Sequence, residues 1–170
     1  MQTNLCELTA TQLIHGYHEK LFSPVEVAKA GLERIGTHDP VLNAFCLVDE
    51  DATMVTAKQS EARWHSGNQL GFLDGVPVSV KDILLAKGWP TLRGSKNIPK
   101  NGAWNEDSPP VARIREAGAV LLGKTTTPEF AWKGVTDSPL TGITRNPWDT
   151  SRTPGGSSGG ATAAVASGMG

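Results

Sequence analysis

The sequence contains little cysteine: its 170 residues include only Cys6 and Cys46. These two are not spaced like metal ligands and cannot build a disulfide framework, which favours a reducing compartment, and we expect a cytoplasmic protein. An excess of charge of either sign is also missing, since the formal net charge is −1. We therefore expect neither nucleic acid nor an acidic membrane surface as a partner.

Long apolar runs are absent as well, and the first residues are not basic. Nothing in the sequence therefore predicts a signal peptide or a membrane-spanning helix. His15 and His18 lie one helical turn apart, but no acidic or cysteine residue completes a metal-ligand set with them. We interpret them as solvent-facing histidines and expect no metal.

The first third of the sequence is predicted to be helical, and the rest alternates between strands and helices. Two capping boxes mark helix starts, one at Thr9 and one at Ser23, which is followed by Pro24. The pattern predicts an α/β fold with helices packed around a mixed β-sheet, in one domain, with residues 1–66 as a helical N-terminal region and residues 70–170 as the α/β part. The predicted elements are a helix after Thr9 with Leu13, Ile14, Tyr17 and Leu21 on one face, a helix from Ser23 to about Ile35, a strand at 42–48, a helix at 50–65, a strand at 75–82, a helix after Ser108 and a strand at 119–122.

Residues 153–160 (TPGGSSGG) are the most informative segment, because four glycines flank two serines and an alanine-rich stretch follows. Glycine allows close approach of the backbone, and serine favours helix N-caps, so the segment predicts a tight loop leading into a helix. Hydroxyl and N–H groups gathered at such a turn suit anion binding or acyl transfer. The alternatives are a flexible linker and a phosphate cradle.

Residues 118–125 (GAVLLGKT) match the P-loop expression, yet their four middle residues are apolar. A P-loop needs a polar, glycine-rich turn, whereas this run is typical of a buried strand. A nucleotide-binding role therefore remains only as an alternative, to be tested with Lys124→Ala and a nucleotide-binding measurement.

Lys81 lies near the end of the predicted strand at 75–82, in which Val76, Val78 and Val80 share one side. Pro77 favours the start of a strand or an edge position. A lysine removed from water has a lowered pKa and in its neutral form can act as a general base. The alternative is an exposed lysine or one paired with Asp82.

Taken together, six segments resemble the amidase signature family in order and spacing, and the resemblance extends from about Leu8 to Gly170. They are residues 75–82 (GVPVSVKD), 91–95 (TLRGS), 117–125 (AGAVLLGKT), 128–130 (PEF), 146–148 (NPW) and 154–160 (PGGSSGG).

The resemblance implies a Ser–Ser–Lys triad that hydrolyses a small-molecule amide without metal or organic cofactor. Lys81 matches the general base, and Ser157 matches the bridging serine that the family holds in a cis peptide after glycine. Ser158 matches a supporting residue. The surrounding glycines, Gly155, Gly156 and Gly159, match the supporting loop.

The family's nucleophilic serine lies downstream, in a Gly-x-Asp-x-Gly-Gly-Ser stretch, and Ser138, Ser151 and Ser167 do not fit it. We therefore interpret the chain as the N-terminal portion of a larger amidase, in which residues 70–170 are the start of the catalytic core. We expect the isolated 170 residues to be inactive and prone to associate. A homodimer is left open. The alternatives are the amidase component of a tRNA-dependent glutamyl/aspartyl amidotransferase, which the segment 128–135 resembles less well, and a non-catalytic truncated fragment.

Three aromatic residues near the site motifs, Phe130, Trp132 and Trp148, have two interpretations. Aromatic residues at this spacing are more often part of a core, and the alternative is that they line the wall of a substrate pocket.

Overall fold

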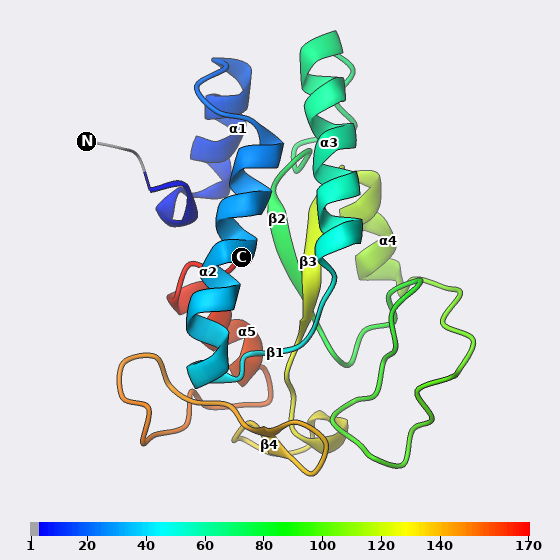
Figure 1. The fold of residues 1–170 in the computed structure, drawn as a ribbon. Coiled ribbons are helices and arrows are strands. Elements are labelled where there is room, and N and C mark those ends of the chain that lie inside the picture. The colour runs from blue at the N-terminus through cyan, green and yellow to red at the C-terminus, as the bar shows by residue number, and fades with distance from the viewer. Residues whose placement is uncertain (1–3) are drawn as a thin grey trace.

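The computed structural model describes residues 4–170 and has the expected α/β fold (Figure 1). Helices α2 (Pro24–Leu42), α3 (Glu50–Ser66) and α5 (Gly159–Ala166) pack on one face of a three-stranded sheet, and α4 (Pro109–Glu116) packs on the other. The remaining elements are the 3-10 turns Leu5–Glu7 and Glu129–Ala131, helix α1 (Ala10–His18), strands β1 (Phe45–Val48), β2 (Pro77–Lys81) and β3 (Val120–Thr125), and the hairpin of β4 (Asp137–Ser138) and β5 (Gly142–Ile143).

Both capping boxes form as predicted. The Thr9 side chain accepts from Gln12 N–H and the Ser23 side chain accepts from Glu26 N–H, and in each case the third helical residue bonds back to the cap. These reciprocal bonds satisfy amide groups that the first turn leaves without partners. Leu21 was wrongly placed on the first helix, because α1 ends at His18 and Leu21 is 70% exposed.

Helix α2 continues seven residues beyond the expected end at Ile35. Pro40 sits in its last turn, where the missing N–H removes only one helical bond before the helix ends. Asn43 then adopts a left-handed conformation with φ 52°, and Asp39 Oδ1 accepts the N–H groups of Ala44 and Phe45. The strand predicted at 42–48 is therefore shorter, because Leu42 is still helical.

The sheet has the strand order β1-β3-β2, with β2 parallel and β1 antiparallel to β3. The predicted mixed sheet is thus confirmed, and Pro77 is the first residue of β2, at an edge of the sheet formed by residues 4–170. Strand β3 runs three residues past the expected end at Leu122. Between β2 and β3 the register shifts by one residue: Val78 pairs with Leu121, but Ser79 pairs with Gly123.

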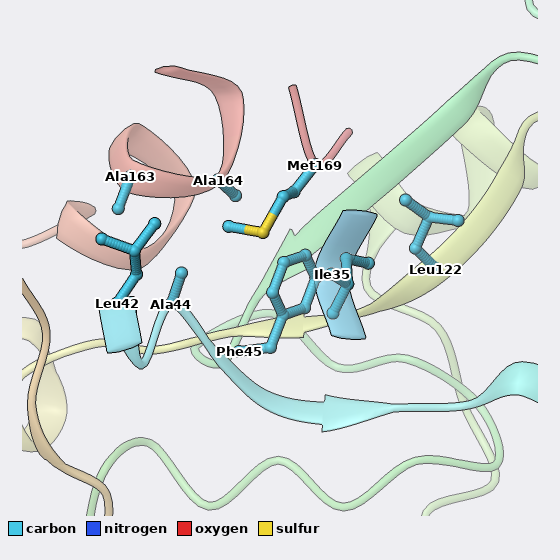
Figure 2. Close-up of a cluster of buried hydrophobic side chains, with 8 residues drawn as sticks. All are labelled: Ile35, Leu42, Ala44, Phe45, Leu122, Ala163, Ala164 and Met169. Carbon is cyan, nitrogen blue, oxygen red and sulfur yellow. The ribbon is translucent and has the colours of Figure 1, made fainter. Parts of the chain in front are cut away.

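The main hydrophobic core lies where α5 and the end of α2 cover β1 and β3 (Figure 2). Figure 2 shows Phe45 and Ile35 beneath Met169, with the small residues Ala163 and Ala164 of α5 close to Leu42. Small side chains let α5 approach the sheet closely, and this fixes the helix whose first turn follows the Gly/Ser loop. Strand β3 is buried along its whole length.

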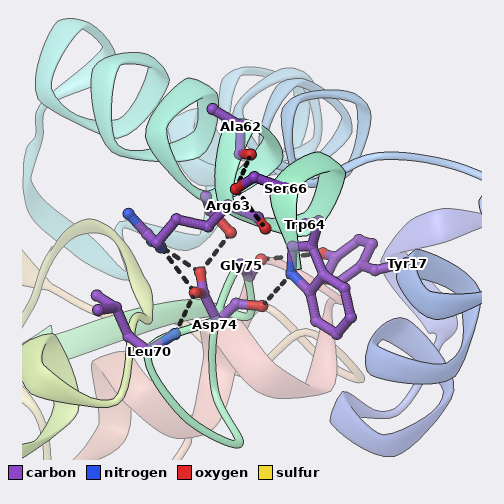
Figure 3. Close-up of polar contacts among 9 residues, drawn as sticks. Tyr17, Ala62, Arg63, Trp64, Ser66, Leu70, Asp74 and Gly75 are labelled. Carbon is purple, nitrogen blue, oxygen red and sulfur yellow. Dashed lines mark hydrogen bonds and ion pairs between the residues drawn. The ribbon is translucent and has the colours of Figure 1, made fainter. Parts of the chain in front are cut away.

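A second anchor holds the start of β2 (Figure 3). Asp74 accepts two bonds from the Arg63 guanidinium at 2.8 and 2.7 Å and one from the Ser60 hydroxyl at 2.6 Å. Trp64 donates to the Asp74 carbonyl, and the Tyr17 hydroxyl donates to the Gly75 carbonyl. Helices α1 and α3 are thereby tied to the turn from which β2 leads to Lys81.

Within residues 4–170, none of the helices combines the length and the hydropathy that crossing a bilayer requires.

Candidate active site

Lys81 and the two serines of the Gly/Ser loop come together at the end of β2. Lys81 Nζ lies 2.8 Å from Ser157 Oγ and 3.0 Å from Ser158 Oγ. Ser158 is the N-cap of α5, and its carbonyl accepts the Thr162 N–H at 3.0 Å. The prediction that this loop leads into a helix is confirmed, and the three residues that the sequence singled out share one site.

Two threonines hold the loop in place, Thr136 at both of its ends and Thr127 at its middle. The Thr136 hydroxyl donates to the Gly155 carbonyl at 2.8 Å and accepts from Gly159 N–H at 3.0 Å, and the Thr127 hydroxyl donates to the Ser157 carbonyl at 3.3 Å. The peptide bond between Gly156 and Ser157 is cis, as the resemblance implied. A segment bonded at so many points is not a flexible linker, so that alternative is wrong.

The glycines of the loop are required by space and by backbone conformation. A Cβ on Gly156 would meet the backbone of Gly134 and Val135, and one on Gly159 would meet Thr136. Gly155 has a φ of 88°, which side-chain-bearing residues rarely adopt. Gly156 and Gly159 therefore let the loop lie directly against residues 134–136, and Gly155 allows the left-handed conformation that precedes them.

Burial lowers the pKa of Lys81. The alternative of a pair with Asp82 is wrong, because the Asp82 carboxylate is bonded to Lys124 Nζ at 2.8 Å. No acidic side chain within residues 4–170 forms an ion pair with Lys81. A lysine that is desolvated and has hydroxyl neighbours in place of carboxylates can shed its proton and accept another.

Lys124 is a structural residue that the motif analysis did not assign. Its side chain is fully buried and also donates to Thr91 Oγ1 at 2.6 Å and to the Pro90 carbonyl at 3.0 Å. Burial lowers its pKa, although Asp82 opposes this. The nucleotide-binding alternative is wrong, because Gly123, Lys124 and Thr125 belong to buried β3 and form no phosphate-binding turn. The available signal in the sequence for a buried lysine was the position of Lys124, which follows the apolar residues 119–122 and Gly123.

The three aromatic residues do not belong to the core: Phe130 is 51% exposed, Trp132 83% and Trp148 87%. Phe130 and Trp132 lie on the segment between Thr127 and Thr136, the two residues that fasten the Gly/Ser loop. Trp148 lines a separate pocket beside α2, with His38 and Val41. Phe130 and Trp132 therefore belong to a segment whose two ends are bonded to the Gly/Ser loop, whereas Trp148 does not.

Comparison with known proteins agrees with this geometry. The family model described as Amidase matches residues 26–170. The chain is 44% identical over 164 residues to a glutamyl-tRNA(Gln) amidotransferase subunit of Acidothermus cellulolyticus, covering 96% of this chain and 32% of that protein. The same subunit of Salinispora tropica is 43% identical over 166 residues, with 96% and 33% covered.

Solved structures of similar fold include amidases. A crystal structure of an amidase matches with a TM-score of 0.87 and 34% identity, covering 95% of this chain and 37% of that one. The native peptide amidase from Stenotrophomonas maltophilia matches with a TM-score of 0.87 and 31% identity, with 94% and 34% covered. The chain belongs to the amidase signature family, and it spans about a third of the length of the relatives it matches.

Proposed function

We propose that the complete protein containing this chain hydrolyses the C–N bond of an amide by acyl transfer, with Lys81 as general base and Ser157 as proton relay. The observation that carries the proposal is the 2.8 Å contact between Lys81 Nζ and Ser157 Oγ, at a lysine whose pKa burial lowers. Membership of the amidase signature family supports it.

In the proposed reaction, neutral Lys81 accepts the Ser157 hydroxyl proton while Ser157 takes the proton of a nucleophilic serine. By the family resemblance, that serine lies downstream of Gly170. Its oxygen attacks the amide carbon, the tetrahedral intermediate collapses, and the proton returns through Ser157 to the leaving amine. Water then cleaves the acyl ester by the same relay, which gives the carboxylate and restores neutral Lys81.

Ser158 has a supporting role in this scheme. Its hydroxyl oxygen, 3.0 Å from Lys81 Nζ, accepts one N–H of the lysine. This bond orients the amine without taking part in the transfer, so the nitrogen lone pair can face Ser157. Thr127 and Thr136 set the position of Ser157 through the loop backbone.

The second candidate is release of ammonia from glutamine within a multi-subunit amidotransferase. The chain is 38–44% identical to glutamyl-tRNA(Gln) amidotransferase subunits and 29–36% identical to the chains of the solved structures. The higher identity to the amidotransferase subunits favours this second candidate. The two candidates share Lys81 and Ser157 and differ in substrate and partners. Glutamine hydrolysis that depends on other proteins of such a complex and on an aminoacylated tRNA would select this one.

The test is hydrolysis of a panel of simple amides and glutamine by the complete protein. Lys81→Ala and Ser157→Ala should each lower kcat by at least about a hundredfold, since each removes a proton-transfer group. Lys58→Ala, which changes an exposed lysine of α3, is the matched control and should leave kcat unchanged. Full activity of Lys81→Ala would exclude the proposed mechanism.

A further inference from the structure

Thr125 carries a buried hydroxyl group that the proposed mechanism does not use. Its side chain is fully buried, and its Oγ1 is the one buried side-chain polar atom of residues 4–170 that lacks a hydrogen-bond partner. Burying a hydroxyl without a partner is costly, so such a group in a folded protein calls for an explanation. The adjacent Thr126 shows the ordinary arrangement, because its Oγ1 lies 2.6 Å from Thr144 Oγ1.

The sheet places Thr125 beside Lys81. In the parallel pairing of β2 and β3, Lys81 is the register partner of Thr125, and across the antiparallel pair Thr125 faces Phe45. Register partners on neighbouring strands, about 4.8 Å apart, point to the same face of the sheet. That face carries the core of Figure 2, which contains Phe45 and Ala163 of α5.

Lys81 has one N–H more than its observed partners accept. A protonated lysine donates three hydrogens, and the two contacts within residues 4–170 are those to Ser157 and Ser158. In the proposed reaction, Lys81 is charged after it has accepted the Ser157 proton. A group that accepts a hydrogen bond from the third N–H of Lys81 therefore acts at that stage. Thr125 thus offers a buried acceptor without a partner, and Lys81 offers an N–H without an acceptor. The two residues are register partners on adjacent strands and point to the same face of the sheet.

We propose that Thr125 is a positioning residue for Lys81. The Thr125 hydroxyl oxygen accepts a hydrogen bond from the third N–H of the Lys81 ammonium, either through one bridging water or directly after a small rotation of the lysine side chain. The role of this contact in catalysis rests on the proposed function, in which Lys81 is the base. The contact itself does not, because it follows from the strand register and the buried hydroxyl.

Other ionisable groups around Lys81 are already engaged. Asp82 and Lys124 pair with each other, and the Cys46 thiol of β1 donates to the Lys124 carbonyl. Glu129 accepts from the Ser95 hydroxyl, and Lys133 pairs with Asp137. Residues 154–170, which include the loop and α5, contain no ionisable side chain. A change at Thr125 therefore acts on Lys81 without first rearranging another charge.

The contact would favour the charged form of Lys81 against its burial. Thr125→Val keeps the shape and removes the acceptor, so the pKa of Lys81 should fall by about one unit, as expected for a hydrogen bond to a charged group. Competitive labelling with acetic anhydride between pH 6 and 11, followed by mass spectrometry of the Lys81 peptide, measures that pKa without requiring turnover.

Two variants serve as controls. Thr125→Ser retains the hydroxyl and should restore the wild-type pKa of Lys81. Thr126→Val removes the neighbouring hydroxyl, which is bonded to Thr144, and should leave the pKa of Lys81 unchanged. An unchanged pKa in Thr125→Val, or an equal shift in Thr126→Val, overturns the proposal.

A second measurement covers the case in which Thr125→Val does not fold. A high-resolution crystal structure of the wild-type complete protein should show Thr125 Oγ1 joined to Lys81 Nζ directly or through one ordered water. A Thr125 hydroxyl bonded elsewhere, or to nothing, overturns the proposal. If the complete protein hydrolyses no amide but Thr125→Val still lowers the pKa of Lys81, the proposed function is excluded and the contact between Thr125 and Lys81 is supported.

Discussion

Lys81 and Lys124 lie on neighbouring parallel strands, within one register position of each other, and their side chains leave opposite faces of the sheet. Val80 pairs with Lys124 and Lys81 pairs with Thr125, so the two lysines alternate in direction. Lys124 meets a carboxylate on its face and Lys81 meets two hydroxyls on the other. The same end of the sheet thus holds a lysine paired with a carboxylate and a lysine that contacts only hydroxyl groups among residues 4–170.

Breaking the buried ion pair should destabilise the fold. Lys124→Met leaves the Asp82 carboxylate buried with only weak backbone bonds, from Leu92 at 3.2 Å and Gly94 at 3.4 Å. Removing one partner of a buried pair costs about 3–5 kcal/mol. Urea unfolding of the wild-type chain and the variant measures the difference. The double variant Lys124→Met/Asp82→Asn should recover part of the loss, and an equally unstable double variant would contradict this explanation.

Stability should also depend on pH through Asp74. Burial raises the pKa of this carboxyl group, but hydrogen bonds from Arg63, Ser60 and the Leu70 amide outweigh burial and leave it below the ordinary value. Its contribution is therefore present above the unfolded-state pKa of about 3.9 and is lost as the pH falls through the lower folded-state pKa.

Asp74→Asn should reduce the free energy of unfolding at neutral pH by about 2 kcal/mol and flatten its dependence on pH below about 4. Denaturant unfolding monitored by tryptophan fluorescence between pH 2 and 7 measures both effects. Glu106→Gln changes an exposed acid and serves as the control. The same acid dependence in wild type and Asp74→Asn would rule out this assignment.

Gly123 should not tolerate alanine. A Cβ at this position would meet the Leu47 carbonyl of the neighbouring strand, so Gly123→Ala must separate β1 from β3. We expect a loss of about 3 kcal/mol, which is typical of overpacking. Gly36→Ala is the matched control: Gly36 is an exposed position of α2 with open space around it, and alanine there should stabilise the fold by about 0.5–1 kcal/mol. Thermal unfolding separates the two, and a neutral Gly123→Ala would contradict the strand pairing.

Gly160→Ala should displace the first turn of α5. The added Cβ would meet Thr126 and the Ala44 carbonyl, so the helix must move away from β3 and carry Ser157 with it. We expect lower stability by about 1–3 kcal/mol, and a fall in kcat of the complete protein larger than any change in KM. Amide hydrolysis and thermal unfolding of the variant measure both, with Gly36→Ala again as the control. A fall in stability without loss of kcat would mean that α5 does not set the position of Ser157.

Local signals in the sequence predicted the helix starts and the site residues. The capping residues Thr9 and Ser23 act within one turn, and the motifs around Lys81 and Ser157 were sufficient to place both residues on the expected elements. The end of α2 could not be predicted, because it depends on Asp39 binding the amides that follow the helix. The partner of Asp82 was also hidden, since it lies on a strand forty-two positions away in the chain.

The one-residue register shift between β2 and β3 determines which residues are neighbours at the sheet edge. Strand β3 carries one extra residue, Leu122, between the partners of Val78 and Ser79. If the strands instead paired in step, with Leu122 opposite Ser79, Lys81 would face Lys124 on the same side of the sheet. Two ammonium groups would then repel each other beside Ser157, and Asp82 would lose its partner. The bulge at Leu122 thus sends the two lysine side chains to opposite faces and gives Lys81 an uncharged register partner, Thr125.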